Sequence, residues 1–168
     1  MLSSILKKST CANCKFCCSF RRQSLWETPV FNEEAMHELK KLFPSVKFRK
    51  AGDSNQSYTF DISEEYKTQD SEEEVPCPFL NPKNGCSLSA ELKPFDCKIW
   101  PLRAVKESEN SSISIALSPT CPAINKLPLN QIKDLLDSGL GKQIILYAHE
   151  NPDILKEKTI FLSNIIYS

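Results

Sequence analysis

Several features that mark common classes of protein are scarce or missing in this sequence. Only four glycines occur, and neither G-x-G-x-x-G nor G-x4-G-K-[ST] is present, which argues against a dinucleotide fingerprint and a P-loop. The formal net charge is zero, so the basic excess of a general nucleic-acid binder is lacking. No apolar run approaches the roughly 20 residues of a membrane span, and the apolar part of the N-terminus is too short for a secretory signal. We therefore expect a cytoplasmic protein that binds neither nucleic acid nor membrane.

Histidine is also scarce, and no acid–base pair stands out. His37 and His149 both lie away from the cysteines along the chain, and we interpret them as structural or surface residues. Three carboxylates near conspicuous motifs, Glu27, Asp61 and Asp96, have no spacing that demands catalysis, and we interpret them as surface or capping groups. The sequence therefore identifies no catalytic residue, and whether the protein is an enzyme stays open.

Cysteine is what the sequence has in unusual density. The eight cysteines are Cys11, Cys14, Cys17, Cys18, Cys77, Cys86, Cys97 and Cys121. The first four form C-x2-C-x2-C-C, and two residues between thiols let a tight turn aim both sulfurs at one centre. Because cytosolic thiols are kept reduced, this density indicates a metal site or a reactive thiol more than a disulfide framework. We predict that all eight cysteines are candidate metal or cluster ligands.

The adjacent pair Cys17 and Cys18 limits how these thiols can be shared. Neighbouring side chains diverge by about 100° in a helix and about 180° in a strand, so both thiols do not easily bind one small ion. The first segment therefore feeds two centres, or one of its thiols is not a ligand. As a single ligand set we favour Cys11, Cys14 and one of the adjacent pair, joined by distant cysteines from 77–121.

An all-cysteine ligand set suits either zinc or an iron–sulfur cluster. The middle cysteines are spaced C-x8-C-x10-C, unlike the paired C-x2-C motifs of zinc ribbons. Aromatic residues near the cysteines either exclude water from a cluster or form ordinary core: Phe16, Phe20, Trp26, Phe79, Phe95 and Trp100. Adjacent cysteines and bulky neighbours lead us to favour a [4Fe–4S] cluster over zinc. Electron transfer or metal handling, with a redox or protein partner, is the corresponding role.

Three segments together resemble a known family. CANCKFCC, CPFLNPKNGCSL and KPFDCKIWPL are similar to the CxxCxxCC, or YkgJ-like, zinc- or iron-chelating family. The family's later C-x-F-L and G-C pair corresponds to Cys77 and Cys86, and its R-P-x-x-C-R-x-x-P segment corresponds to the surroundings of Cys97. Lys93 and Lys98 stand where the family commonly has arginine.

The resemblance spans about residues 11–125 and implies metal chelation without fixing the metal. Similar cysteine segments in bacterial flagellin lysine methylases keep a methyl-transferring, protein-modifying enzyme as a second hypothesis. A zinc-stabilised interaction module is the third. Basic residues beside the cysteines are hypothesised to stabilise an anionic thiolate cluster or to bind an anionic substrate: Arg21, Arg22, Lys93, Lys98 and Arg103.

The pattern along the chain predicts a small α+β domain over 1–168. We expect a cysteine-cluster core over 11–125, with few short strands and long loops ordered by metal, and a helical segment over 126–168.

Individual elements can be placed within this outline. A helix is expected between Asn32, as its cap, and Pro44. Strands are expected at 58–62 and 112–117, and 64–74 is expected to be a solvated acidic connector. From Leu129 the pattern becomes helical and divides at Gly139 and Gly141. A last short helix is expected with Asn151 as cap, and residues 159–168 either extend it or return as a strand.

Overall fold

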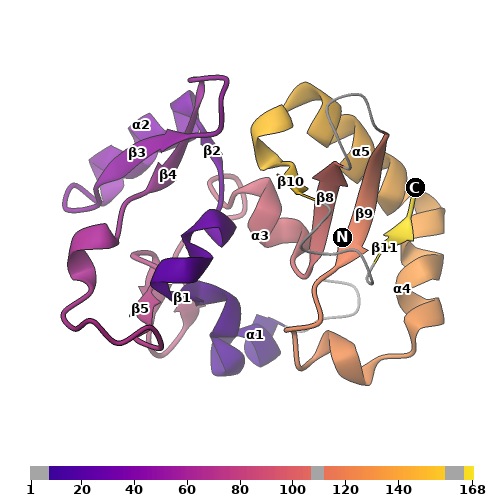
Figure 1. Cartoon of the computed structure of the whole chain (residues 1–168), viewed down its shortest axis with the longest axis horizontal. Coiled ribbons are helices and arrows are strands. Elements are labelled where there is room, and N and C mark those ends of the chain that lie inside the picture. Colours follow the sequence, from indigo (N-terminus) through magenta and orange to yellow (C-terminus); the bar gives the residue numbers. More distant parts are fainter. Residues whose placement is uncertain (1–7, 107–111, 158–164) are drawn as a thin grey trace. The chain divides into compact units, whose positions relative to one another are not determined.

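The protein has the α+β fold that the sequence predicts (Figure 1). The computed structural model describes residues 8–106, 112–157 and 165–168. The chain forms two compact units, Lys7–Cys97 and a second that contains Lys98–Ser168. The division falls at 97/98, whereas the sequence places its internal boundary at 125/126. Whether the two units make up the single domain expected stays a prediction, and each unit is described separately.

Short helices and small antiparallel sheets build the first unit. The helices are α1 (Lys8–Cys14), η2 (Phe16–Cys18), η3 (Arg22–Glu27), α2 (Glu33–Leu42) and η4 (Ser63–Glu65), and α3 (Phe95–Ile99) begins at its end. The strands are β1 (Ser19–Phe20), β2 (Phe31–Asn32), β3 (Phe48–Ala51), β4 (Ser57–Phe60), β5 (Val75–Pro76), β6 (Leu80–Asn81) and β7 (Gly85–Cys86). They pair as β2-β4-β3, β1-β5 and β6-β7. The strand expected at 58–62 is therefore confirmed as β4, displaced toward its N-terminal side.

Helix α2 confirms the helix predicted after Asn32. The Asn32 Oδ1 accepts a hydrogen bond from the Ala35 N–H at 2.8 Å, which satisfies one of the donors that a helix leaves unpaired at its start. Glu33 and Glu34 lie in the first turn, where their charges favour the positive end of the helix dipole. The helix ends at Leu42, two residues before the proline that cannot continue it.

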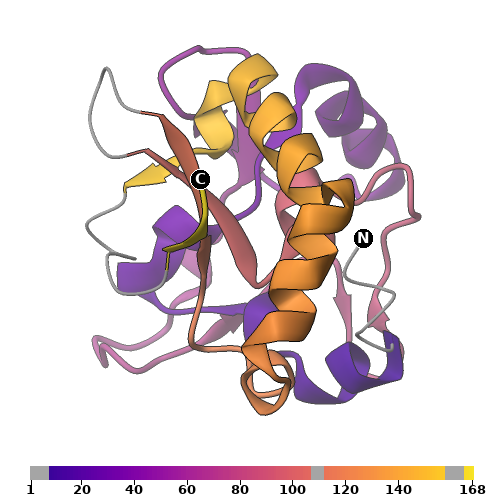
Figure 2. The ribbon, with the colours of Figure 1, turned by 90° about the vertical axis from the view of Figure 1, so that its right-hand side faces the viewer.

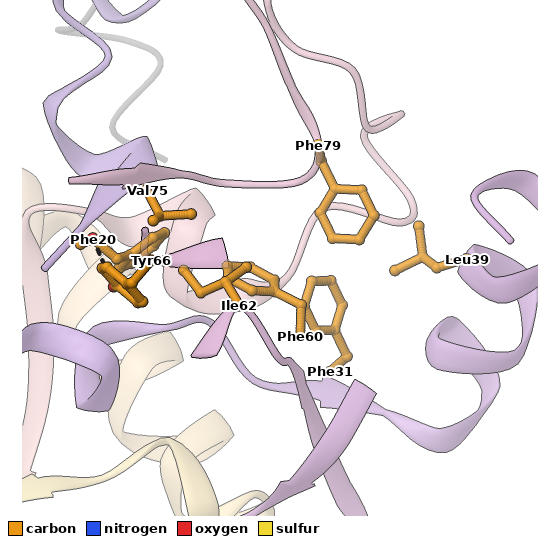
Figure 3. Close-up of a cluster of buried hydrophobic side chains, with 8 residues drawn as sticks. All are labelled: Phe20, Phe31, Leu39, Phe60, Ile62, Tyr66, Val75 and Phe79. Carbon is orange, nitrogen blue, oxygen red and sulfur yellow. Dashed lines mark hydrogen bonds between the residues drawn. The ribbon is translucent and has the colours of Figure 1, made fainter. Parts of the chain in front are cut away.

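An aromatic cluster forms the core of the first unit (Figure 3). Phe79 is 2% exposed, and its ring makes contacts at centroid distances of 5.2–6.4 Å with Phe31, Phe43, Phe48 and Phe60. Edge-to-face rings at such distances stabilise beyond the area that they bury. Cys77, two residues before Phe79, packs against this cluster. The core therefore fixes the start of the second cysteine segment.

The second unit is a sheet with helices beside it. The strands β8 (Leu102–Lys106), β9 (Ile113–Leu117), β10 (Lys156–Glu157) and β11 (Ile165–Tyr167) lie in the order β10-β8-β9-β11. The helices are η5 (Ile124–Lys126), α4 (Leu129–Leu135), η6 (Leu136–Leu140), α5 (Gly141–Glu150) and η7 (Pro152–Ile154). Figure 2 shows α4, η6 and α5 following one another, and α5 packs against β8 and β9.

The helical pattern predicted from Leu129 is confirmed, including its break. Gly139 has a φ of 117° inside η6, a conformation that glycine adopts at little steric cost. The last short helix is confirmed as η7, with Asn151 at its N-cap position and Pro152 in its first turn. The Asn151 side chain makes no capping bond to η7, because its Nδ2 donates to the Tyr147 carbonyl of α5 at 3.0 Å. The strand alternative for the C-terminus holds at Ile165–Tyr167, and 158–164 lie outside the described residues.

No helix in the described parts of the chain has the length and apolar character needed to cross a membrane.

Candidate metal centre

The strand pair β1–β5 joins the first cysteine segment to the second. Phe20 lies opposite Val75 and Ser19 opposite Pro76. One step further along the same antiparallel register, the Cys77 N–H donates to the Cys18 carbonyl at 2.7 Å. The backbone therefore places the end of the C-x2-C-x2-C-C motif beside Cys77, although the two segments are far apart in sequence.

A tight hairpin then returns the chain so that Cys86 comes back toward Cys77. In the β6–β7 pair Cys86 lies opposite Leu80, whose N–H donates to the Cys77 carbonyl at 2.9 Å. The Asn81 Oδ1 accepts from the N–H groups of Lys83 and Asn84, both at 2.9 Å, which is the turn geometry that asparagine favours. Gly85 closes the hairpin with a φ of 79°, which side chains rarely tolerate.

Cys97 is positioned by the short helix α3 and by a buried carboxylate beside it. The Cys97 N–H donates to the Pro94 carbonyl at 3.1 Å. Asp96 is 4% exposed, and its Oδ2 accepts from the Val30 N–H at 3.0 Å. The interpretation of Asp96 as a surface carboxylate is therefore wrong, because it is buried and ties α3 to the chain before β2. The sequence carried no signal for this long-range bond.

The pKa values of two thiols show which cysteines influence one another. Burial raises the pKa of Cys77 to about 12, and the negative charges of Cys86 and Cys17 raise it further. Burial also raises the pKa of Cys97, as do the charges of Asp96, Cys77 and Cys17, while Lys93 lowers it. Each thiol opposes ionisation of its neighbours, so these cysteines lie within electrostatic reach of one another. We refer to Cys17, Cys77, Cys86 and Cys97 as the inner thiols.

The remaining cysteines have other surroundings. Cys11 and Cys14 are exposed on α1, and we refer to them as the outer pair. Cys18 is half-buried and gives its backbone carbonyl to Cys77. Cys121 is buried at 8% exposure within the second unit. Of the ligand set favoured from sequence, the structure brings Cys17 and three distant cysteines together, and it places the outer pair at the surface.

The inner thiols do not form a closed metal site as they stand. Within 8–106, 112–157 and 165–168, no three Cys, His, Asp or Glu side chains are arranged to hold a metal ion. All four inner thiols are half-buried, and an all-sulfur donor set is one that zinc and iron–sulfur clusters accept. The donor chemistry therefore fits such a group, provided that the thiols lose their protons and draw closer on binding.

Arg21 and Arg22 form ion pairs with the acidic connector over 64–74, which the sequence predicts to be a solvated loop. Arg21 pairs with Glu72 at 2.8 Å and Glu74 at 3.2 Å, and Arg22 lies 3.7 Å from Glu73. Arg21 directly follows β1 and Glu74 directly precedes β5, so this ion pair lies at the end of the β1–β5 pair. These ion pairs stabilise the β1–β5 strand pair that positions the cysteines. They also pair the positive charges of Arg21 and Arg22 with carboxylates, although those charges are hypothesised to stabilise a thiolate cluster.

The other basic residues differ in their surroundings. Lys93 lowers the pKa of Cys97, so its charge favours the thiolate there. Lys98 lies in the last turn of α3. Arg103 is 4% exposed, and its guanidinium lies 4.1 Å from the centre of the Trp100 ring. Lys93 is thus the basic residue whose electrostatic effect on an inner thiol is evident.

Among the aromatic residues, those near the cysteines divide between core and surface. Phe20 and Phe79 belong to the hydrophobic core of the first unit. Phe16 is 48% exposed and Trp26 is 40% exposed. The core reading therefore holds for the first two, whereas Phe16 and Trp26 leave much of their surface in water.

The histidines lie at the surface, as expected, and Asp61 makes local hydrogen bonds. His37 and His149 are exposed, and the His37 Nε2 lies 3.7 Å from Glu33 on the same helix. The Asp61 Oδ1 accepts from both the N–H and the hydroxyl of Ser63, which lowers its pKa. Asp61 therefore holds a local turn ahead of η4, whose N-cap position is Ile62 and which has no side-chain cap bond.

No family model, no curated protein and no solved structure matches this chain. The resemblance to the CxxCxxCC family stays a prediction that depends on the three quoted segments.

Proposed function

We propose that the unit Lys7–Cys97 binds a metal centre through the four inner thiols, Cys17, Cys77, Cys86 and Cys97. The observation that carries the proposal is that separate segments converge on Cys77. The β1–β5 pair brings the first motif to it, and the β6–β7 hairpin returns Cys86 toward it. Cysteines that come from separate segments of the chain and gather in one place are typical of a metal-ligand set rather than of thiols that only fill a core.

A [4Fe–4S] cluster is the centre that we propose first, with zinc as the alternative. Both take four thiolates, and the inner thiols include no nitrogen or oxygen donor. An iron–sulfur cluster would supply one-electron chemistry, and the half-buried thiols would leave it close enough to the surface for exchange with a partner. Lys93 would offset part of the negative charge of the thiolates near Cys97. The corresponding role is electron transfer or metal handling.

Metal binding at this site must displace protons. The pKa of Cys77 is about 12, so its thiol is protonated at neutral pH and ionises only when a metal replaces the proton. We therefore expect the affinity for added zinc to rise between pH 6.5 and pH 8.5, by up to about tenfold per pH unit for each proton released. A competition titration with a chromophoric chelator measures this, and an affinity independent of pH would contradict binding to protonated thiols.

The deciding experiment is metal analysis of protein purified without oxygen. A [4Fe–4S] protein should be brown, with broad absorbance near ~400 nm and about four irons and four sulfides per chain. One zinc per chain in a colourless protein would instead establish the zinc alternative. Protein that holds neither metal as purified, and that takes up neither after reconstitution, would refute the proposal.

Single Cys→Ser variants then test the assignment of ligands. Cys77→Ser and Cys97→Ser should lose nearly all bound metal, whereas Cys14→Ser should retain it. Cys121→Ser is a further control, because Cys121 belongs to the other unit. If Cys14→Ser lost as much metal as Cys97→Ser, the outer pair would be ligands and the inner assignment would be wrong.

A further inference from the structure

The outer pair lies on one face of α1, away from the strand on which this helix rests. A helix turns by about 100° per residue, so Cys11 and Cys14, three residues apart, are neighbours on its surface. Ala12 faces the other way: a Cβ built on Gly85 would lie 3.0 Å from the Ala12 Cβ. The helix therefore contacts β7 through Ala12 and presents both thiols to water, and both are exposed.

We propose that Cys11 and Cys14 form an accessible dithiol that low-molecular-weight disulfides oxidise reversibly to an intramolecular disulfide. This site is separate from the inner thiols and does not depend on the function proposed for them. One thiolate attacks a sulfur of the oxidant, a mixed disulfide forms, and a low-molecular-weight thiol leaves. The second thiolate then attacks the mixed disulfide and releases a second thiol. Overall the two protein thiols are oxidised, the oxidant is reduced, and both protons end on the released thiols.

The geometry explains why the bond would be reversible. Side chains three residues apart on a helix have Cβ atoms about 5–6 Å apart, whereas a disulfide requires about 3.5–4.5 Å. Closing the bond must therefore tighten or unwind the last turn of α1, where the Lys15 N–H donates to the Cys11 carbonyl at 3.0 Å. A bond closed against such resistance is easily reduced. Lys15 already has a φ of 56°, so the helix ends at this point.

Accessibility separates these thiols from the inner ones in reactivity. Both outer thiols are exposed, so a small disulfide in solution can reach them. Cys77 instead packs against the aromatic core. We expect the outer pair to exchange at least ~10-fold faster than Cys77.

The sequence provides a direct readout by peptide mapping. Trypsin releases residues 9–15, STCANCK, which contain both outer thiols and no other cysteine. Residues 16–21, FCCSFR, report on Cys17 and Cys18, and residues 68–83 report on Cys77. Full-length protein, with its metal content as purified, is incubated in glutathione buffers of increasing oxidised fraction. The remaining thiols are then alkylated and the protein is digested.

The expected result is an unalkylated 9–15 peptide whose mass is two hydrogens below that of the dithiol form. This peptide should form before the 68–83 peptide reacts, and reduction should restore the dithiol form. Cys14→Ser should abolish the oxidised peptide and leave a mixed disulfide at Cys11, and Cys18→Ser, as the matched control, should leave it unchanged. A crosslink from 9–15 to 16–21 would overturn the proposal, as would no reaction across the full range. Protection of the 9–15 thiols by bound metal would also overturn the dithiol proposal. The proposal that the inner thiols are the metal ligands would fail only if Cys14→Ser also lost the metal.

Discussion

Cys17, one of the inner thiols, shares an eight-residue motif with the outer pair, yet the fold gives them different surroundings. Cys17 continues into β1 and is carried to Cys77 by the strand pair. Cys11 and Cys14 lie one turn earlier and are exposed, on a helix whose Ala12 contacts Gly85 of β7. Packing therefore gives identical side chains a few residues apart different exposure: Cys17 is half-buried, whereas Cys11 and Cys14 are exposed. A dense cysteine motif does not by itself define one site.

Removing the centre of the aromatic core should break this comparison most strongly. Phe79→Ala deletes a ring that contacts four others, and we expect it to lower the free energy of unfolding by about 3–5 kcal/mol. Since Cys77 packs against the same cluster, its alkylation should accelerate, while that of the outer pair should change little. Urea denaturation and peptide mapping measure the two effects.

The control for this variant is Leu42→Ala on α2. Leu42 is 61% exposed, so its truncation should alter stability by no more than about 0.5 kcal/mol. Equal acceleration of the inner and outer thiols in Phe79→Ala would mean that the core does not distinguish them.

Alkaline pH should weaken the metal-free protein through Cys77. Its folded pKa of about 12 lies above the ordinary value of 9.0, so the unfolded thiol ionises first. The stabilising contribution is complete below pH 9 and is lost as pH rises toward 12, on the order of 2 kcal/mol by pH ~11. Cys77→Val should abolish this part of the pH dependence, and unfolding curves from pH 8 to pH 11 would reveal it. An identical pH profile for the variant would show that burial of this thiol has no such effect.

The sequence predicted local features well because each rests on neighbouring residues. The Asn32 cap and the break at Gly139 follow from backbone chemistry that a few residues determine. The candidate site depended on pairings that no local pattern encodes, such as the Cys18–Cys77 backbone bond and the burial of Asp96 against Val30. Divergence of Cys17 and Cys18 was foreseeable from geometry, but which of the two faces Cys77 was not.

The contact between α1 and β7 can be tested with a pair of glycine substitutions. Gly85→Ala and Gly139→Ala both place a side chain at positive φ, 79° and 117°, and we expect each to cost about 1–2 kcal/mol. Gly85→Ala should be the more destabilising, because its Cβ would lie 3.0 Å from Ala12, whereas nothing lies within 4 Å of a Cβ at Gly139. It should also raise the disulfide exchange rate of the outer pair by loosening α1. Unchanged exchange in Gly85→Ala would show that this contact does not restrain the helix.

The smallest expected effect concerns the ion pairs beside the β1–β5 ladder. Arg21→Gln removes the contacts with Glu72 and Glu74, and because Arg21 is 39% exposed and its partners 60% and 45%, we expect a loss below about 1 kcal/mol. Lys41→Gln is the control, since its pair with Glu38 is also solvent-exposed, at 70% and 49%, but lies on α2. The loss in free energy of unfolding should disappear for both variants in about 1 M salt, because exposed charges are then screened within about 3 Å. At low salt, however, only Arg21→Gln should speed alkylation of Cys77, because its ion pairs lie at the end of the β1–β5 pair, next to the bond from the Cys77 N–H to the Cys18 carbonyl. Faster alkylation of Cys77 in both variants would mean that general destabilisation causes the effect. Unchanged alkylation in both variants would mean that the β1–β5 pair and its core contacts position the inner thiols without a contribution from the ion pairs.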